Sequence, residues 1–175
     1  MHNGQLADPL NPHTRAIKEV AGRRKKTDQD HEELSALEWR GGLYLDQKGR
    51  VVVPEDVILA MVIEGAKRNK NGPKAKAGVL GAEPFFPLGY DGPKDAVKLG
   101  EDPNFRDYRG VGIRGTATVM RTRPRFEAWW LAISLLYDDT IIDRREVVTA
   151  LETGGHVIGI GDFRPRFGRF TVEVQ

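Results

Sequence analysis

The sequence predicts an α+β domain in which an antiparallel sheet carries two helices on one of its faces. Two segments, residues 54–68 and 143–155, have apolar residues at helical spacing after good N-terminal signals. Residues 116–126 and 170–174 alternate in polarity as strands do, and an apolar run at residues 127–139 suits a strand covered on both sides. A length of 175 residues accommodates one such domain and an arm.

Residues 1–33 are expected to form an arm that is solvated and partly disordered, or that orders only against a partner. They hold few large apolar residues, and a basic cluster at Arg23–Lys26 precedes an acidic one. The folded domain is expected to span residues 34–175. It would open with one or two short strands in GGLYLDQKGRVVVP, residues 41–54, around a turn at Lys48-Gly49.

The first helix is expected to begin at Pro54, because proline suits the first helical position and the following Glu55 and Asp56 suit the positive end of the helix dipole. KRNKNGPKAKAG, residues 67–78, holds glycine and proline and no acidic residue, so we expect a basic, mobile loop. A short strand is expected in PFFPL. Residues 89–113 are turn-rich and are expected to form a long insertion, which in compact domains is often functional.

The remaining elements complete the predicted sheet. Pro124 ends the alternating strand or places it at a sheet edge, and the apolar run after it would be a central strand. Asp143 caps the second helix with Glu146 in the capping-box position, and the final strand follows. The order is βαββαβ once the insertion and the extended N-terminal arm are set aside. This is the ferredoxin-like order, and the open face of such a sheet often binds nucleic acid.

The segment GIGDFRPRFGRF, residues 159–170, combines flexible, cationic and aromatic residues in one loop. A dinucleotide-binding loop needs its glycines after a strand and before a helix, and this segment has the reverse order. Bare backbone at its glycines can approach a ligand closely, arginines can contact phosphates and phenylalanines can stack on bases. The candidate binding residues are therefore Gly159, Gly161, Phe163, Arg164, Arg166, Gly168 and Arg169. The alternative interpretation places the phenylalanines in the core and the arginines in water.

Two further segments are candidates for phosphate contact. Arg121, Arg123 and Arg125 alternate along a strand, about 6 to 7 Å apart at roughly 3.3 Å per residue, which resembles the phosphate spacing of an extended single strand. The alternative is that they pair with protein carboxylates such as Asp138, Asp139 or Glu173. The predicted basic loop adds Lys67, Arg68, Lys70, Lys74 and Lys76. Together the three segments predict a basic track for single-stranded RNA or DNA.

Composition argues against several other classes of protein. The chain has no cysteine, which excludes disulfides, thiolate metal sites and thiol catalysis. No apolar run approaches the roughly 18 residues of a membrane helix, and the start lacks a secretory signal. We therefore expect a cytoplasmic protein without membrane contact or cofactor. The four histidines lack metal-binding spacing, and His156 is the one we considered as a general base.

The loop also carries a family resemblance. Gly159, Gly161 and the Phe167-Gly168 pair ahead of a terminal apolar segment resemble the glycine-rich loop of the repeat-associated mysterious protein (RAMP) superfamily, with a spacing about one residue shorter. That superfamily includes backbone and processing subunits of CRISPR effector complexes, and its loop contacts RNA backbone. Processing members often carry a catalytic histidine in the first helix, which is absent between Pro54 and Arg68. The resemblance implies RNA binding without cleavage.

A second resemblance covers about residues 38–174. WRGGLYLD, YDGP, DPNFRDYR and MRTRP, together with the loop, resemble a group of uncharacterised bacteriophage and prophage proteins. The expected function is therefore a phage-encoded, non-catalytic nucleic-acid-binding protein in the cytoplasm of a bacterial host. The alternative is a protein-interaction role, as a virion component or as an inhibitor that mimics a CRISPR effector subunit. In that case the arm would mediate a homo-oligomer or a larger assembly.

Overall fold

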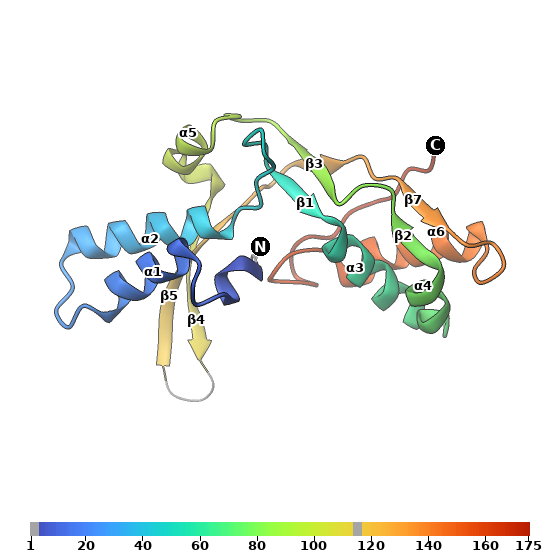
Figure 1. The fold of residues 1–175 in the computed structure, drawn as a ribbon, viewed down its shortest axis with the longest axis horizontal. Helices are drawn as coiled ribbons and strands as arrows, with labels where there is room; N and C mark the ends of the chain where they lie inside the picture. The colour runs from blue at the N-terminus through green and yellow to red at the C-terminus, as the bar shows by residue number, and fades with distance from the viewer. Residues whose placement is uncertain (1–3, 114–116) are drawn as a thin grey trace. The chain divides into compact units, whose positions relative to one another are not determined.

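The computed structural model describes residues 4–113 and 117–175 (Figure 1). The described residues mix helices with short strands, which confirms the predicted α+β class. The chain divides into two compact units, each built from two stretches of sequence. Unit 1 contains Met1–Val52 and Leu88–Trp130, and unit 2 contains Val53–Pro87 and Leu131–Gln175.

Strands of the described chain form three small sheets. The first contains β1 (Val52–Pro54), β3 (Phe85–Tyr90) and β6 (Trp129–Leu131), in the order β1-β3-β6. The other two are the antiparallel pairs β2 (Val79–Gly81) with β7 (Leu135–Tyr137) and β4 (Arg106–Ile113) with β5 (Ala117–Pro124). The βαββαβ arrangement around a single sheet, which the sequence predicts, is therefore not confirmed.

The predicted arm is helical in the structure. A 3-10 turn η1 (Gly4–Ala7) precedes helix α1 (Pro12–Gly22), and helix α2 spans Asp28–Gly42. The predicted boundary at residues 33 and 34 therefore lies inside α2. The two helices lie side by side, Val20 of α1 is buried, and α2 also packs on β5 (Figure 1). Trp39 of α2 is also buried, where its ring lies against Gly100 and its Nε1 donates to Phe105 O at 2.8 Å. The segment is therefore ordered by contacts between the two helices and by contacts of α2 with the expected insertion.

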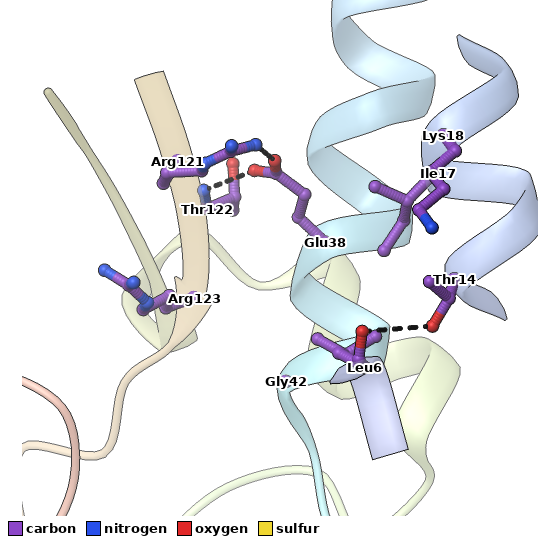
Figure 2. A pocket seen from close by; sticks show the side chains of 9 residues that line it. All are labelled: Leu6, Thr14, Ile17, Lys18, Glu38, Gly42, Arg121, Thr122 and Arg123. Atoms are coloured by element: carbon purple, nitrogen blue, oxygen red, sulfur yellow. Dashed lines mark hydrogen bonds and ion pairs between the residues drawn. The ribbon is translucent and has the colours of Figure 1, made fainter. Parts of the chain in front are cut away.

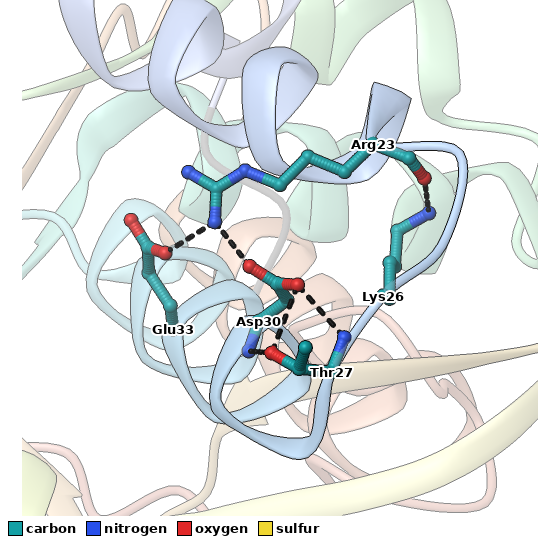
Figure 3. Close-up of polar contacts among 5 residues, drawn as sticks. All are labelled: Arg23, Lys26, Thr27, Asp30 and Glu33. Atoms are coloured by element: carbon teal, nitrogen blue, oxygen red, sulfur yellow. Dashed lines mark hydrogen bonds and ion pairs between the residues drawn. The ribbon is translucent and has the colours of Figure 1, made fainter.

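The charge blocks that suggested a solvated segment instead join α1 to α2 (Figure 3). Arg23, at the end of α1, forms ion pairs with Asp30 and, at 2.9 Å, with Glu33 of α2. Thr27 and Asp30 form a capping box, in which the Asp30 N–H donates to Thr27 Oγ1 and the Thr27 N–H donates to Asp30 Oδ2. The backbone hydrogen bond from Thr27, followed by that from the Arg23 side chain, lowers the pKa of Asp30 to about 2.

The predicted insertion contains regular structure. Helix α5 (Ala96–Glu101) begins at Asp95, whose carboxylate accepts from two backbone N–H groups, and a 3-10 turn η2 (Pro103–Phe105) follows. The second half is β4, which pairs residue by residue with β5. Gly110 and Gly112 interrupt the alternation of side chains in β4, so the sequence pattern of this strand is weak.

Unit 2 is built on helix α3 (Glu55–Lys67) and helix α6 (Arg144–Thr153), close to the bounds that the sequence predicts. The π-helical turn η3 (Gly154–Ile158) continues α6. The expected mobile loop at residues 67–78 instead contains a seven-residue helix, α4 (Gly72–Gly78). Its proline stands in the first turn, where no N–H is needed, and its alanines and lysines favour helix.

Helix α3 and the α6–η3 segment approach to backbone contact through glycines. A Cβ atom on Gly65 of α3 would lie 2.8 Å from Gly154 N and closer still to Ala150 O. A Cβ atom on Gly154 would overlap the Met61 side chain, which is fully buried. Small residues at both positions are therefore a requirement of this packing, since interiors have no room for an added methyl group.

Two of the predicted strands differ from the structure. The expected central strand at residues 127–139 is two three-residue strands, β6 and β7, and its apolar side chains are not covered on both faces, because Trp130 and Leu136 are each 58% exposed. The expected final strand at residues 170–174 has no regular structure. In its place the Phe170 N–H donates to Gly155 O at 3.1 Å, which attaches the C-terminal segment to η3.

The glycine contact between α3 and α6 predicts a stability difference between two helical glycines. Changing Gly65→Ala should destabilise the protein by about 1 to 3 kcal/mol, because the added methyl group meets backbone atoms that cannot move aside. Gly22→Ala, in α1, is the matched control, since no atom lies within 4 Å of its Cβ position. It should be neutral or stabilising by up to about 1 kcal/mol. Chemical denaturation measures both, and equal effects would contradict the close packing.

The Asp30 carboxylate predicts a dependence of stability on acid pH. Its pKa is lowered from 3.8 to about 2 in the folded chain, so its contribution is fully present above about pH 4 and is lost as the pH falls towards 2. Asp30→Asn should therefore lower the melting temperature near neutral pH, and the difference from the parent should shrink towards pH 2. Asp28→Asn removes a carboxylate of the same turn and should not reproduce this pattern. If the difference in melting temperature between Asp30→Asn and the parent does not change with pH, the result would contradict the assignment of this pH dependence to Asp30.

Candidate nucleic-acid interface

The glycine-rich loop is closed at its base by backbone contacts in unit 2. Gly159, at φ +73°, ends η3, and its N–H donates to Gly154 O at 2.7 Å. The Ile160 N–H donates to Gly168 O at 2.9 Å, and Gly168 has φ +74°. A Cβ atom on Gly168 would overlap the Ile160 carbonyl group. Two of the three predicted glycines are therefore needed to close the loop, whatever it binds.

The tip of the loop presents backbone and aromatic surface to solvent. Gly161 has φ +90°, and no atom lies within 4 Å of its Cβ position. The Phe167 N–H donates to Phe163 O at 2.9 Å, and the two rings meet edge to face with centroids 6.4 Å apart. Phe167 is 46% exposed, and the Arg166 guanidinium lies 5.7 Å from the centroid of its ring. The tip thus combines an open backbone position with a partly exposed aromatic ring.

All three arginines of the loop are exposed. The Arg169 Nε donates to Pro165 O at 2.7 Å, which holds the side chain along the loop. The pKa of Glu64, in the last turns of α3, is lowered mainly by a hydrogen bond from Lys67 and further by the charges of Lys67, Arg164 and Arg68. The loop therefore places Arg164 within electrostatic range of the C-terminal end of α3.

The predicted basic segment is only partly available to a ligand. Lys67 Nζ donates to Glu64 at 2.5 Å, and Lys74 Nζ donates to Glu146 of α6 at 2.9 Å. Lys70 lies in the connection from α3 to α4 at φ +62°, and Lys76 is exposed on α4. Within residues 4–113 and 117–175, Lys70 and Lys76 form no side-chain ion pair. This segment and the glycine-rich loop belong to the same unit.

Arg121 and Arg123 lie on β5 and Arg125 follows it, and all three belong to unit 1 and contact protein groups. Arg121 pairs with Glu38 of α2, whose second oxygen accepts the Thr122 N–H at 2.9 Å (Figure 2). Arg125 pairs with Glu127. Arg123 stands opposite Asp107 in the β4–β5 ladder. The structure thus shows the alternative interpretation, pairing with protein carboxylates, for Arg121 and Arg125. The carboxylates are Glu38 and Glu127, which are not the ones that the sequence suggested.

Asp138 and Asp143 have structural contacts, and the candidate general base His156 lies on the surface. Asp138 accepts from the N–H and hydroxyl of Thr140, and Asp143 caps α6. His156 is exposed on η3. In the part of the chain that the structure describes, no group of three or more histidine, cysteine, aspartate or glutamate side chains could hold a metal ion. None of the described helices is both long and apolar enough to cross a membrane.

Sequence analysis missed Glu38 and Glu64, the two carboxylates that most affect the candidate sites. Glu64 precedes Lys67 by three residues on a predicted helix, so an ion pair between them could have been expected from spacing alone. Glu38 is 83 residues from Arg121, and no local pattern links the two.

Comparison with known proteins adds no further assignment, because no protein-family model, curated protein or solved structure matches this chain.

The Arg121–Glu38 pair predicts that Arg121 stabilises the fold. Arg121→Gln removes the guanidinium from a carboxylate whose side chain is only 9% exposed, so the free energy of unfolding should fall by about 1 to 3 kcal/mol. Arg166→Gln, on the exposed loop, is the control and should change stability by less than about 0.5 kcal/mol. Adding Glu38→Gln to Arg121→Gln should cost less than the sum of the two single changes. Additive effects would contradict a direct interaction.

Proposed function

We propose that this chain is a non-catalytic protein that binds single-stranded nucleic acid through the glycine-rich loop and the adjacent end of α3. Single-stranded RNA is the proposed ligand, with single-stranded DNA as the alternative. The observation that carries the proposal is the loop itself. Its base is closed by Gly159 and Gly168, so exposed arginines and a partly exposed phenylalanine stand on a backbone of defined shape.

The chemistry of the tip suits a flexible polyanion. Guanidinium groups bind phosphate oxygens with several donors at once, and an exposed ring offers a surface on which any base can stack. Arg164 and Arg166 provide the guanidinium groups, and Phe167 provides the exposed ring. Gly161 leaves its side of the backbone open, so a strand can approach the main chain there. These contacts position a strand without reading its sequence.

The surroundings of the loop add positive charge. Glu64 is engaged by Lys67, while Arg68, Lys70 and Lys76 extend the cationic surface along the end of α3 and into α4. Binding there would release counterions from the nucleic acid, so affinity should fall steeply as salt concentration rises. In unit 1, Arg121 and Arg125 pair with Glu38 and Glu127, and Arg123 faces Asp107 in the β4–β5 ladder, so these three arginines are proposed only as secondary phosphate contacts.

Resemblance supports the choice of ligand and the biological setting. In the RAMP superfamily the corresponding loop contacts RNA backbone, and Gly159, Gly161, Phe167 and Gly168 match its pattern. The broader resemblance to bacteriophage and prophage proteins is the reason for proposing that this chain acts in the cytoplasm of a bacterial host. The proposal excludes cleavage, since the first helix of unit 2 lacks the histidine that processing members often carry there.

A protein-assembly role is the second candidate, and one surface favours it. Leu80 and Leu136 stand directly opposite each other in the β2–β7 pair and are 60% and 58% exposed. An apolar cross-strand pair left in water is a common feature of protein contact sites. Light scattering without nucleic acid distinguishes the candidates. A concentration-dependent oligomer that Leu136→Ser dissolves would favour assembly, and a monomer would favour nucleic-acid binding.

The loop predicts a defined loss of affinity and of salt dependence. A double change, Arg164→Gln with Arg166→Gln, should weaken binding of a labelled single-stranded RNA by about tenfold or more, because two charge-assisted contacts are removed. The slope of log affinity against log salt should fall by about 1.4, at about 0.7 per phosphate contact on a single strand. Fluorescence anisotropy at two or more salt concentrations measures both quantities.

Arg144→Gln with Arg145→Gln is the matched control, since both arginines are exposed and lie at the start of α6, at the opposite end of that helix from the loop. The control should leave the affinity within about twofold, because these charges are screened over such a separation. No binding of the parent protein at low salt would contradict the proposal. An equal loss of RNA affinity in the loop variant and in the control would also contradict the proposal, since non-specific electrostatic attraction would then explain the binding.

A further inference from the structure

The two-stranded sheet of unit 2 has two edges that differ (Figure 1). At the β2 edge, the Val79 N–H donates to Ala75 O of α4. The Gly81 N–H at the same edge donates to Glu55 Oε1 of α3 at 2.6 Å. Free backbone groups at a sheet edge can pair with a further strand, and here the chain itself uses these two donors. The β2 edge is therefore closed.

The β7 edge is open. The Asp138 N–H donates to Gly78 O at 2.9 Å, which sets the alternation of the β2–β7 ladder. Leu135 and Tyr137 have the opposite alternation, so their backbone N–H and C=O groups point away from β2. Among the residues that the structure describes, these groups have no hydrogen-bond partner. A further strand could therefore bind along β7.

The sequence of β7 also favours pairing. Residues 132–137 contain no charged residue and no proline, which are features that keep exposed edge strands apart. Leu136 is 58% exposed and stands opposite Leu80, which is 60% exposed. Strand addition gains affinity from backbone hydrogen bonds at an open edge and from side chains beside it. Both contributions are present at β7.

We infer that β7 pairs with β7 of a second copy of this chain, antiparallel and around a two-fold axis at Leu136. In this register Leu135 of each copy exchanges backbone hydrogen bonds with Tyr137 of the other copy. The two Leu136 side chains meet at the close, non-hydrogen-bonded position. The result is a four-stranded sheet with an apolar face, and the closed β2 edges limit it to two copies.

The charges at the strand ends suit a second copy of the same strand. In this register Asp138 lies opposite Ser134 of the second copy, and both residues are exposed. Within the described residues, Thr140 occupies only the Oδ1 atom of this carboxylate, so the serine hydroxyl group can donate to Oδ2. The two Asp138 residues lie about 13 Å apart at roughly 3.3 Å per residue, where their repulsion is largely screened. The strand is thus complementary to itself.

The contact is small, so pairing of the free chain is weak. It involves residues 134–138 and Leu80 of each copy, whereas a standard interface has roughly 20 to 30 residues a side. We expect a dissociation constant of about 0.1 to 1 mM. The free chain should therefore be a monomer at the micromolar concentrations at which light scattering separates the two candidate functions.

A shared RNA strand would strengthen the pairing. Two copies held on one flexible strand have an effective concentration in the millimolar range, which matches the expected dissociation constant. Copies bound to the same RNA should therefore associate through β7 and bind cooperatively. This step rests on the proposed function, whereas the pairing of β7 with β7 does not.

Sedimentation velocity of the full chain without nucleic acid tests the pairing directly. The parent should be mostly monomeric at about 10 µM and about half to four fifths dimeric at about 1 mM, with no larger species. Hydrogen exchange of the Leu135 and Tyr137 amides should slow by about two- to fivefold over this range, because they enter hydrogen bonds. Leu136→Ser should stay monomeric and should not show this slowing.

Leu10→Ser is the matched control, since Leu10 is 67% exposed and belongs to unit 1. It should dimerise as the parent does. The inference is overturned if the parent stays monomeric at about 1 mM, if larger species form, or if Leu10→Ser prevents the dimer as Leu136→Ser does. A dimer in which exchange at Leu135 and Tyr137 is unchanged also overturns it. The exchange measurement on the parent decides the question even if Leu136→Ser does not fold.

A titration with two RNA lengths separates pairing from RNA binding. On an RNA that holds two copies, the parent should show a Hill coefficient approaching about 2, and Leu136→Ser one of about 1. On a short RNA that holds one copy, the two proteins should agree within about twofold, because Leu136 lies outside the loop. Independent binding of the parent to the longer RNA would overturn the role of the pair on RNA. Absence of all RNA binding would contradict the proposed function instead, and sedimentation would still decide the pairing.

Discussion

The close contact of α3 with the α6–η3 segment is the constraint on which unit 2 depends. Gly65 and Gly154 allow the two backbones to meet, and any side chain there would separate them. The π-helical turn that follows α6 then brings Gly155 against Phe170 and ends at Gly159. The base of the glycine-rich loop is therefore set by helix packing rather than by a sheet, because the C-terminal segment joins no ladder in the described structure.

Carboxylates from helices decide which basic side chains remain available. Glu38 on α2 engages Arg121, and Glu64 on α3 engages Lys67. The Lys67–Glu64 pair is exposed and contributes little to stability, whereas the Glu38 side chain is largely buried, but both pairs reduce the charge that a polyanion would meet. A count of lysines and arginines in the sequence therefore overestimates the cationic surface. The arginines of the loop, by contrast, are exposed and form no side-chain ion pair with another described residue.

Helix-start signals in the sequence predicted where the two main helices of unit 2 begin to within one residue. The capping box at Asp143 begins α6, because it acts within a single turn, and α3 begins directly after Pro54, which stands at the N-cap and not at the first helical position that the sequence predicts. Burial was predicted poorly, since Trp130 and Leu136 are apolar and yet exposed, and burial depends on distant partners. The glycines of the loop were predicted to let its backbone approach a ligand, and the structure adds that Gly159, Gly161 and Gly168 have positive φ angles. The pairing of Arg121 with Glu38 could not be predicted, because nothing local marks it.

The central claim is that the tip of the glycine-rich loop contacts a nucleic-acid strand. Photo-crosslinking of the full chain to single-stranded RNA that carries 4-thiouridine, followed by mass spectrometry of the digested protein, tests it most directly. The account predicts crosslinked nucleotide on the peptide that contains Phe163 and Phe167, because stacking on the exposed ring brings a base into contact there. Crosslinks confined to other peptides, with none on residues 159–170 at saturating RNA, would contradict it.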